Sequence, residues 1–595
     1  MNENPIGKIG TLEVRLAEPS LDQPRYERRY IPVTPASREI IGSDAKVAEE
    51  STVAEWHIDD WAAGEGDLHW RNNGRYNVSS GAGPVSDGTG VTVNALVEAT
   101  NDTGGGTAMT DAGILARAAG RFVTADDMSG TLFFWNDTNE EWDVGWTIGG
   151  SGSDDVFSIA AVDDTHIFVS DIDGSIREVQ YGSNAEHYAA WGPEMVSFLG
   201  QLYGLWGNSL ADIDTSTTDT RTVVVDVGGT TDRLDEFKRR LTTSDVGPIW
   251  LAPLNDGRTY IYEYNAADDT GYIVGALPDD VKPYDIWFHS GIYFATFRYA
   301  ADHPLSGDAW LYYQIGGQRG VAGPIRSLTG TTASKAITIA GVVGDRLYMV
   351  FDGALWAYDL SSGGISMAAR SVPDPRTTMV YGSDVHIATG STAHRIILDQ
   401  YDTGADAELT TGRHDFGYLG LNKILTRVTV TCESALATGE TVGLAYSVDG
   451  GSYTTASGTM SAGETAKTWT ISTSSTTVRG IEFELKLLPT ANTSASAPKI
   501  VAVTAEAIGS ESRLEWVMQI DVSDNNEQHG QSIIDGLKTL KTGHQVVSFT
   551  DPWNVLDYTA PETFDVTVEE CNIPDTRAPG GNPMALIRLR AVETV

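Results

Sequence analysis

The sequence has only two cysteines, Cys432 and Cys571, among its 595 residues. Two cysteines so far apart provide no CxxC pair of the kind that binds zinc. A single disulfide between them could not hold together a chain of 63.9 kDa. The sequence therefore excludes the disulfide-rich class of small secreted domains. We expect both cysteines to be buried free thiols.

Long apolar runs are also absent. No stretch reaches the roughly 18 unbroken apolar residues that a membrane-spanning helix needs. The first residues, MNENPIGKIG, lack the apolar segment and cleavage site of a secretory signal. We therefore expect no membrane insertion, no signal peptide and synthesis in the cytoplasm of a host cell. Apolar residues still make up 41% of the chain, which is enough for packed cores, and the length predicts about four domains at roughly 150 residues each.

Positive charge is scarce. The chain has 40 basic residues against 81 acidic ones, giving a formal charge of −41. A surface this negative repels phosphate backbones and anionic lipids, so we expect no nucleic-acid partner. Acidic surfaces with little lysine suit molar salt, so a halophilic source is one explanation, and solubility at high copy number is the other. A melting curve that shows no stabilisation between low and molar NaCl would exclude the first.

Catalytic motifs are missing as well. The sequence contains no GxSxG, HExxH, P-loop or GxGxxG motif in the required context. Its eleven histidines are scattered, and neither His57 nor His69 has a flanking ligand pattern. We therefore assign no catalytic, cofactor-binding or metal-binding residue, and the ligand-binding residues stay unknown. A carboxylate pair for glycoside hydrolysis remains open, because acidic residues are too abundant for any one of them to be informative.

What the sequence does contain is a repeat. Seven short apolar segments recur at intervals of roughly forty residues. They are GRFVTA from Gly120, HIFVS from His166, QLYGLW from Gln201, RTYIYEY from Arg258, GIYFATF from Gly291, RLYMVF from Arg346 and VHIATG from Val385. Each segment reads as the second strand of a four-stranded unit, which is typical of a β-propeller. A stack of β-sandwiches is the alternative, but it predicts no such marker.

Turns and strands around these markers fit the same interpretation. The dipeptides Asp173-Gly174 and Asp352-Gly353 suit the type I′ turn of a hairpin. The segment Gly90–Ala99 is expected to close the ring by pairing with the last blade around Ile396–Gln400. We expect a short helix over Asp232–Leu241 and a protruding loop over Ala300–Asp308 within the fifth blade.

The pattern changes near Gly404. Residues Gly412–Ile508 alternate apolar and polar side chains over about eight strands, which predicts a jelly-roll-like β-sandwich. Within this region, Ser447 to Tyr453 has the spacing of the Asp-box hairpin of sialidases. Enzymes with Asp-boxes repeat them in successive blades, whereas this one lies alone and outside the propeller, so we interpret it as a structural turn.

The last segment differs again. QSIIDGLKTLKTG places Ile533, Ile534, Leu537 and Leu540 on one helical face, with Gly543 at the C′ position. The predicted division is an N-terminal arm (1–55), a propeller of about seven blades (56–404), a β-sandwich (405–510) and a small α+β assembly module (511–595). The fold class is therefore mainly β.

The order of these parts resembles the tail-tip, or minor tail, proteins of long-tailed viruses of bacteria and archaea. Three stretches carry the likeness, namely Trp56–Gly81, the sandwich from TGRHDFG through SAPKIVAV, and WVMQIDV with GQSIIDGLKTLKTGHQVVSFTDP. The resemblance implies a virion component of the distal tail, whether tail tip, fibre or baseplate, that acts in host attachment and tail assembly. It transfers no individual functional residue.

Three functions follow as expectations. The first is a structural, non-enzymatic adhesion protein whose partners are other tail proteins and a host surface glycan or receptor. We expect it to be a homo-oligomer, a trimer or a hexameric ring, because several weak sites then act together. The second is a propeller glycosidase or lyase that acts on host glycans. The third is a lectin-like cell-surface protein, which the absence of a signal peptide disfavours.

Overall fold

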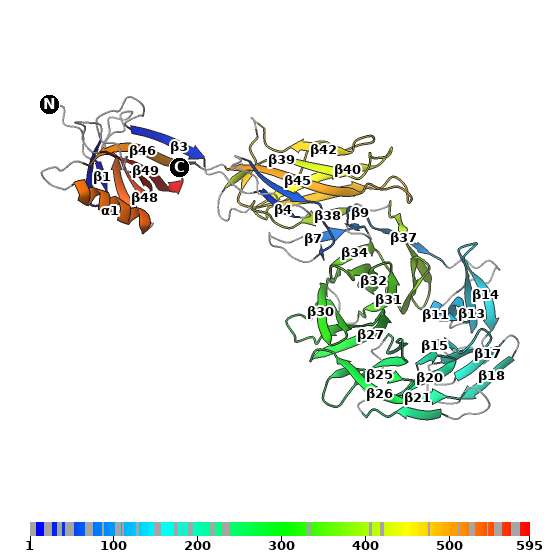
Figure 1. Cartoon of the computed structure of the whole chain (residues 1–595). Coiled ribbons are helices and arrows are strands. Elements are labelled where there is room, and N and C mark those ends of the chain that lie inside the picture. The colour runs from blue at the N-terminus through cyan, green and yellow to red at the C-terminus, as the bar shows by residue number, and fades with distance from the viewer. Residues whose placement is uncertain are drawn as a thin grey trace, which may run out of the picture.

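The computed structural model shows a mainly β protein with three bodies, each labelled in Figure 1. Its description covers residues 7–16, 26–32, 38–41, 53–65, 75–85, 89–100, 109, 112–126, 130–147, 156–171, 176–180, 183–188, 194–214, 221–228, 238–329, 335–403, 407–416, 422–473, 476–509, 512–522, 530–543, 545–551, 562–572 and 584–594. Across these residues there are 49 strands and one helix.

The first body is built from both ends of the sequence. Its seven-stranded sheet has the order β2-β1-β47-β48-β49-β46-β3. The strands are β1 (Gly7–Ile9), β2 (Leu12–Leu16), β3 (Tyr26–Pro32), β46 (Ser512–Asp521), β47 (Val547–Asp551), β48 (Glu562–Asn572) and β49 (Met584–Thr594). The stretch predicted as an N-terminal arm thus supplies edge and inner strands to the C-terminal sheet. We call this body the terminal module.

The predicted C-terminal helix is present as α1 (Gly530–Thr542). Ile533, Ile534 and Leu537 are buried, and Leu540 packs beside them against the sheet, so the apolar face was predicted correctly. Gly543 follows the helix, but its backbone does not have the positive φ of a left-handed cap. Its N–H instead continues the helical pattern by donating to the carbonyl of Thr539 at 2.9 Å.

The second body contains two sheets that share one hydrophobic core. An eight-stranded sheet contains β4 (Arg38–Ile41), β5 (Val53–Ile58), β8 (Ala82–Pro84), β9 (Val91–Val93), β39 (Lys423–Cys432), β42 (Ala466–Thr470), β43 (Arg479–Gly480) and β45 (Ile500–Gly509). Opposite it run β6 (Gly64–Glu65), β7 (Arg75–Ser80), β38 (Glu408–Thr411), β40 (Thr441–Val448), β41 (Thr454–Thr455) and β44 (Phe483–Thr490). We call this body the two-sheet domain.

The Asp-box segment forms the turn between β40 and β41. Asp449 and Gly450 both have positive φ, at 50° and 72°. The Asp449 carboxylate accepts hydrogen bonds from the N–H groups of Ile481 and Glu482 at 2.8 and 2.9 Å. Its side chain therefore joins the hairpin to the two residues that precede β44, which agrees with a structural role.

The third body is a propeller-like ring. Six separate four-stranded antiparallel sheets form it, and β31 to β34 form four more strands at one end of a ten-stranded sheet. The first strands of these units are β11 (Ala112–Ala118), β15 (Val156–Ala161), β19 (Met195–Phe198), β23 (Leu241–Thr243), β27 (Val281–His289), β31 (Thr338–Val343) and β35 (Thr377–Tyr381). Each first strand contacts the first strand of the next unit, and β35 contacts β11, so the circle is closed.

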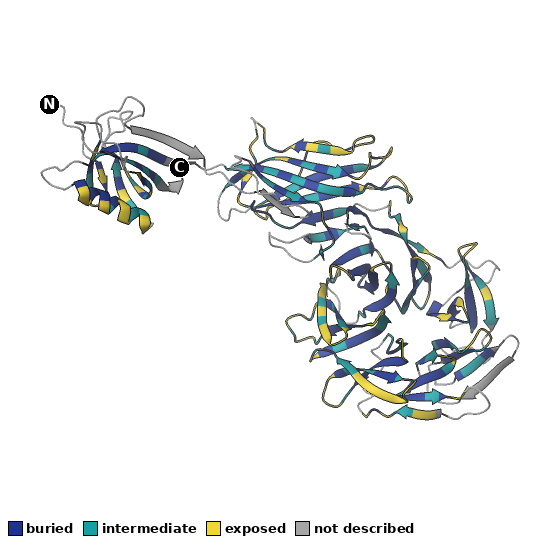
Figure 2. Ribbon diagram, in the orientation of Figure 1, coloured by how far each residue is buried: buried dark blue, intermediate teal, exposed yellow. Residues whose placement is uncertain are grey.

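The remaining ring strands run outward from these first strands. They are β12 (Arg121–Asp126), β13 (Thr131–Asn136), β14 (Glu141–Thr147), β16 (Ile167–Asp171), β17 (Ile176–Gln180), β18 (Ser183–Tyr188), β20 (Gln201–Trp206), β21 (Ser209–Ile213), β22 (Arg221–Val225), β24 (Pro248–Pro253), β25 (Thr259–Asn265), β26 (Thr270–Ala276), β28 (Ile292–Tyr299), β29 (Ala309–Ile315), β30 (Gln318–Ile325), β32 (Arg346–Phe351), β33 (Ala354–Asp359), β34 (Ile365–Arg370), β36 (Asp384–Ala388), β37 (Ala393–Tyr401) and β10 (Ala95–Ala99). Figure 2 shows inner strands largely buried and outer strands such as β26 exposed.

Ring closure follows the predicted pairing. In β10, Leu96 and Val97 lie opposite Ile397 and Ile396 of β37. The segment predicted as one closing strand is divided, however, because β9 joins the two-sheet domain through Val91, which lies opposite Ile500. One short segment therefore belongs to two bodies.

Six of the seven sequence markers lie on the second strand of their unit, but RTYIYEY does not. It forms β25, the third strand of its sheet. The second strand there is β24, which has proline at both ends and is buried along its whole length, so it shows no alternation. Between β32 and β33, the Asp352-Gly353 turn has the predicted positive φ at both residues, whereas Asp173-Gly174 lies outside the described residues.

The predicted helix over Asp232–Leu241 does not extend to its last residue. Residues 229–237 lie outside the described part, and Leu241 begins strand β23, where it is paired with Trp250 of β24. Sheet formation at the ring centre overrides the local helical pattern there. The loop Ala300–Asp308 connects β28 to β29, as expected.

The three bodies are nested along the chain rather than placed one after another. The terminal module uses strands from 7–32 and 512–594, the two-sheet domain uses 38–93 and 408–509, and the ring uses 95–401. The predicted linear division differs from this, since Trp56–Gly81 forms strands of the two-sheet domain and not the entry to the ring. Pairing partners far apart in sequence produce the nesting, and local patterns do not reveal them.

A continuous sheet joins the ring to the two-sheet domain. Strand β34 pairs in parallel with β6 through Ile365 and Gly64, and β6 pairs with β7. Gly64 has a φ of 77°, and a Cβ there would lie 2.4 Å from the carbonyl oxygen of Ile365. Only glycine allows the two backbones to approach so closely.

Three arginines from the ring reinforce this junction. Arg346 is 4% exposed and donates to the carbonyls of Val85 and Pro84 at 2.6 and 3.3 Å. Arg326 forms an ion pair of 2.8 Å with Glu65. Arg370 donates to the Ser80 hydroxyl at 3.2 Å. The ring and the two-sheet domain are therefore held as one stiff unit.

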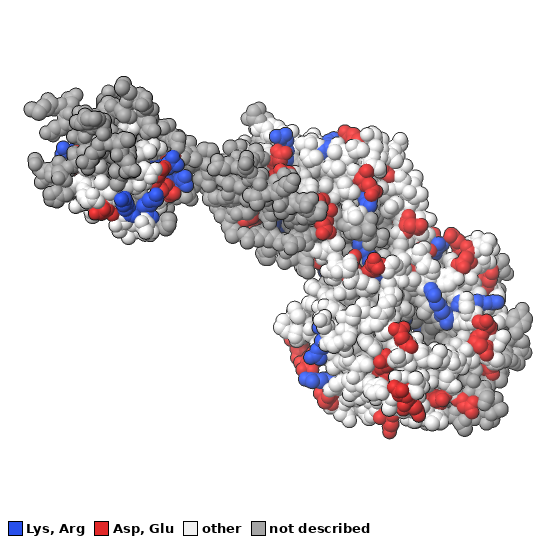
Figure 3. Space-filling model, in the orientation of Figure 1, with Lys and Arg blue, Asp and Glu red and all other residues white. Residues whose placement is uncertain are grey.

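Both cysteines are buried and free, as predicted. Burial raises the pKa of the Cys432 thiol to about 11, so it is unreactive at neutral pH. No helix of the described chain is long and apolar enough to cross a membrane. Acidic side chains are spread over the face of the ring that Figure 3 shows.

Candidate functional site

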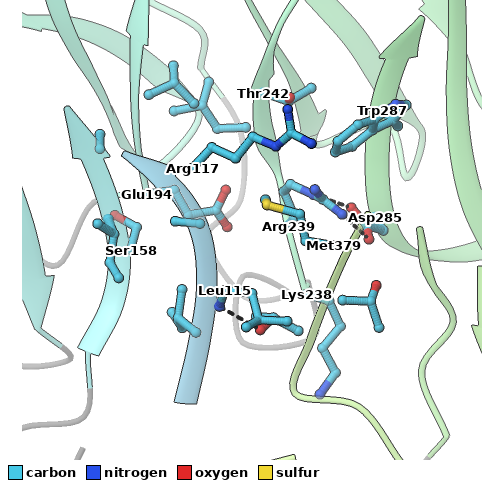
Figure 4. A pocket seen from close by; sticks show the side chains of 18 of the residues that line it. Leu115, Arg117, Ser158, Glu194, Lys238, Arg239, Thr242, Asp285, Trp287 and Met379 are labelled. Carbon is cyan, nitrogen blue, oxygen red and sulfur yellow. Dashed lines mark hydrogen bonds and ion pairs between the residues drawn. The ribbon is translucent and has the colours of Figure 1, made fainter. Parts of the chain in front are cut away.

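The ring encloses a central cavity of about 600 Å³. All seven first strands contribute to its wall, because each runs beside the ring axis. Figure 4 shows side chains from several of these strands converging on the opening. A volume of this order suits a small ligand, since ligand pockets are typically about 300–1,000 Å³.

The cavity wall contains more cationic than anionic side chains. Four cationic residues line the cavity, and only two carboxylates do so. The cations are Arg117, Lys238, Arg239 and Arg376, and the carboxylates are Glu194 and Asp285. In the whole chain the ratio is reversed, with 81 acidic residues to 40 basic ones.

Asp285 is bound by groups of the ring itself. Its side chain is fully buried and accepts two hydrogen bonds from Arg239, both 2.9 Å long. It also accepts from the N–H groups of Ile286 and Ile339 at 2.8 and 2.7 Å. Burial raises its pKa, while the Arg239 guanidinium opposes that shift. This pair connects β27 to β31 and has little capacity left for a ligand.

Glu194 also has a hydrogen-bond partner within the ring. Its carboxylate accepts a hydrogen bond of 2.7 Å from the backbone N–H of Arg240. Burial raises the pKa of Glu194, and the charge of Arg240 acts in the opposite direction. The two acidic groups of the cavity thus have internal partners, and no unbound pair of carboxylates is present among the described lining residues.

Lys238 differs from these two carboxylates in the partners of its charged group. Its backbone N–H donates to Tyr284 at 2.7 Å, which fixes the start of its side chain. Among the described residues its ammonium group forms no ion pair within 4 Å. Partial burial lowers the pKa of Lys238, and the nearby positive charge of Arg376 lowers it further. Asp374 and Asp285 offset this only in part.

Arg117 contributes a further positive charge from β11. Its guanidinium donates to the carbonyl of Val380 at 3.1 Å and lies 5.5 Å from the ring centre of Tyr381. Neither partner is negatively charged. Its charge therefore stays available to the cavity, although its position is fixed.

Apolar and aromatic groups complete the wall. Trp287 and Phe288 from β27 are half-buried, and Phe157 from β15 is 39% exposed. The Arg239 guanidinium stacks 4.7 Å from the ring centre of Trp287 and holds it in place. Fixed aromatic faces beside cations can bind a ligand that has both an apolar face and a negative charge.

No ligand-binding residue was predicted from sequence, and the cavity shows why. Its charged residues come from five separate segments of the chain, within first strands or directly before them, and none lies in a motif. The strand markers lie mostly on second strands, one position outward from the wall. His57, which was considered as a metal ligand, contacts the Thr504 hydroxyl at 2.7 Å in the two-sheet domain, and His69 lies outside the described residues. The described part of the chain contains no cluster of metal-binding side chains.

Comparisons with known proteins give little further identification. No family model matches the chain, and no curated protein matches it. Among solved structures, it is similar to "YCF48 bound to D1 peptide", with 11% identity and a TM-score of 0.37 over 54% of this chain and 99% of the other. YCF48 from Cyanidioschyzon merolae is similar at 9% identity and a TM-score of 0.36, over 48% and 95% of the two chains. At these values neither supports an inference about function.

Proposed function

We propose that this protein is a structural and adhesive component of the distal tail of a long-tailed virus, where the ring contacts the host surface and the terminal module attaches to other tail proteins. The nested construction is the observation that carries the proposal. It places the ring at one end of the molecule and the terminal module at the other (Figure 1). A protein that joins a scaffold to a surface needs such separated ends.

The stiffness of the ring junction supports the same role. The sheet through β34, β6 and β7 and the buried Arg346 transmit force between the ring and the two-sheet domain without a flexible linker. An enzyme that trims glycans has no such requirement. The internal partners of Glu194 and Asp285 also favour adhesion over glycoside hydrolysis, because a catalytic pair must be free to reach substrate.

We also propose the finer fold assignments. The ring is a seven-bladed propeller in which β31 to β34 are the sixth blade in sequence order, since β31 contacts both β27 and β35. The two-sheet domain is a β-sandwich built around its shared core. Several copies in the virion, as a trimer or a hexameric ring, would add avidity to weak individual contacts.

The test is to locate the protein in virus particles. Antibodies raised against the ring should label the distal tail end of intact particles, and the purified chain should bind host envelope preparations without releasing sugar. Labelling of the capsid or of no particle at all would contradict the proposal. Release of sugar that is lost on changing a cavity carboxylate would favour the glycosidase instead.

A further inference from the structure

Strand β26 is an apolar strand on the outer edge of the ring. In the described part of the chain it pairs with β25 and with no second strand. Its residues 270–273 are exposed, Tyr272 at 47% and Ile273 at 53%, and Figure 2 shows this exposure on the outside of the ring. Toward its end the strand is partly covered, because the Gln314 side chain donates to the Val274 carbonyl. Alternate N–H and C=O groups of β26 therefore point away from β25 without a partner strand.

The other outer strands of the ring contain residues that discourage pairing at an edge. Each includes at least one charged residue in its sequence, as the sequences show: EWDVGWT (β14), SNAEHY (β18), RTVVV (β22), QRGVAGPI (β30), ISMAAR (β34) and ALVEA (β10). The sequence of β26, TGYIVGA, has neither a charged residue nor a proline. Charged side chains and proline are common means of keeping an exposed edge from pairing with another chain. Strand β26 lacks both.

The turn before β26 is acidic. It contains Asp268 and Asp269, whose carboxylates accept hydrogen bonds of 2.9 and 2.8 Å from the side chains of Asn265 and Tyr264. Both donors are uncharged. Among the described residues neither carboxylate forms an ion pair. The start of the strand therefore carries two negative charges that the ring does not balance by contact.

A groove lies at the other end of the strand, between the end of β26 and the start of β30. Its volume is about 400 Å³, and its wall includes residues 276–279, Arg258 and Arg319. Arg258 is paired with Asp279, with the Nε and Oδ1 atoms 2.7 Å apart. Arg319 is exposed and forms no ion pair with any described residue. The groove therefore keeps one positive charge that its own wall does not balance.

Antiparallel pairing of two copies of β26 would bring these opposite ends together. Around a two-fold axis at the middle residue, Ile273, the start of each copy lies beside the end of the other. The acidic turn of one copy is then next to the groove of the other, and the same contact occurs twice. Between the two ends the edge is uncharged. The strand is therefore complementary to itself in backbone hydrogen bonding and in charge.

We propose that the exposed edge of β26 pairs antiparallel with β26 of a second copy of this chain, with Asp268 and Asp269 of each copy against Arg319 of the other. The neighbouring outer strands add exposed apolar side chains, Val223 of β22 at 49% and Val321 of β30 at 41%. The formal charge of −41 repels two copies at long range, but physiological salt screens charges more than about 8 Å apart. Because the contact is two-fold, it can join two of the trimers or rings proposed above.

Sedimentation equilibrium of the full-length chain tests the pairing. We expect the chain to be predominantly dimeric at about 100 μM. Ile273→Lys places a charge on the edge and should raise the dissociation constant about tenfold or more. The matched control Val144→Lys makes the same kind of change at a valine of β14 that is 46% exposed, and it should leave the dissociation constant unchanged.

Charge reversal tests the antiparallel arrangement. Asp268→Arg and Arg319→Glu should each weaken the dimer about tenfold, because each places like charges at both ends of the paired strands. Combined in one chain, the two changes restore opposite charges and should restore dimerisation. Circular dichroism would show that all variants fold.

An introduced cysteine locates the contact. In the Ile273→Cys variant two thiols lie opposite each other at the two-fold axis, within the distance that a disulfide spans. The native Cys432 and Cys571 are buried and do not compete. Under mild oxidation the Ile273→Cys chain should therefore cross-link into dimers, whereas the Val144→Cys chain should not.

Three results would overturn the proposal. They are a monomer at about 100 μM, a dimer of full affinity in the Ile273→Lys variant, and no recovery of dimerisation when Asp268→Arg and Arg319→Glu are combined. These results are independent of the location of the protein in particles. Dimerisation through β26 without virion labelling would contradict the tail function alone, and labelling by a monomeric chain would contradict the β26 contact alone.

Discussion

Two groups of cations in this molecule make opposite use of the same chemistry. At the junction between the ring and the two-sheet domain, Arg346 donates to two backbone carbonyls and Arg326 pairs with the Glu65 carboxylate. In the central cavity, Lys238 forms no ion pair within 4 Å among the described residues, and partial burial lowers its pKa. The positive charge stabilises the fold at the junction, whereas in the cavity it has no such role.

This difference separates structure from recognition. Removing a buried arginine that satisfies several backbone carbonyls leaves those acceptors without donors, so the fold loses stability. Removing a cation that has no partner leaves nothing unsatisfied. Stability measurements on both groups therefore test which cations the fold needs and which it does not need.

The largest effect is expected at Arg346. Arg346→Ala should lower the free energy of unfolding by about 3–5 kcal/mol, because it leaves two carbonyls and Asp359 without their buried partner. Calorimetry would show this as a lower melting temperature of the ring transition. The control Arg258→Ala removes an exposed pair with Asp279, which solvent screens, and should leave the melting temperature nearly unchanged. Equal effects of the two changes would show that the junction contributes nothing.

His386 offers a third case, a buried basic side chain that the fold keeps uncharged. It is 1% exposed and lies edge-on to Phe122 and Trp135, with ring centres 4.8 and 4.9 Å away. Burial and the charge of Arg395 lower its pKa to about 3. The unfolded chain takes up the proton first as the pH falls below the ordinary value of about 6.5, so this stability is complete above that pH and decreases below it.

The expected loss from His386 is about 3 kcal/mol between pH 6.5 and pH 4, at about 1.4 kcal/mol per pH unit. Chemical denaturation across this range would measure it. The variant His386→Phe should have a smaller slope of stability against pH than the parent chain. An unchanged slope would assign the acid sensitivity to other groups.

Gly64 tests the continuous sheet. Gly64→Ala should cost about 2–3 kcal/mol, because the new Cβ would lie 2.4 Å from backbone and the residue already has a φ of 77°. Gly120 is a matched control, with a φ of 68° and no atom within 4 Å of a Cβ. Gly120→Ala should cost only about 1 kcal/mol from the backbone conformation. Thermal melts of both variants give the difference in stability loss, which is due to the close approach of the Gly64 and Ile365 backbones.

The smallest effect is expected at Lys238. Lys238→Met should change the free energy of unfolding by no more than about 0.5 kcal/mol, and any change should be stabilising, since it relieves repulsion from Arg376. Urea denaturation at neutral pH would measure this. A loss as large as that of Arg346→Ala would mean that Lys238 is structural, and the contrast between the two groups would disappear.

The sequence predicted those features that depend on neighbouring residues. The Asp352-Gly353 turn and the apolar face of α1 with Ile533 and Leu537 are both present. Each depends on a turn type or a periodicity that short segments encode. The ring repeat was visible for the same reason, because each four-stranded unit is made of consecutive hairpins.

One distant pairing, that of β10 with β37, was predicted, because a closed ring needs a strand to complete its last blade. The other distant pairings were not predictable. Nothing near Ile9 indicates that it lies opposite Phe549, and nothing near Trp56 indicates that it pairs with Ala505. The cavity has the same limitation, since nothing near Arg117 or Lys238 in the sequence indicates that the two residues line one cavity. Only the closed ring brings them together. Local competition also misled the prediction at Leu241, where a helical pattern yields to a strand.

The pairing of Ile9 with Phe549 has a consequence for biosynthesis. Strands β1 and β2 pair with each other, but their further partners β47 and β46 are made only after the entire ring has emerged from the ribosome. A chain released early could form the ring yet would lack a complete terminal module. Any partner that recognises the complete terminal module would therefore not bind prematurely terminated chains, without a separate proofreading step.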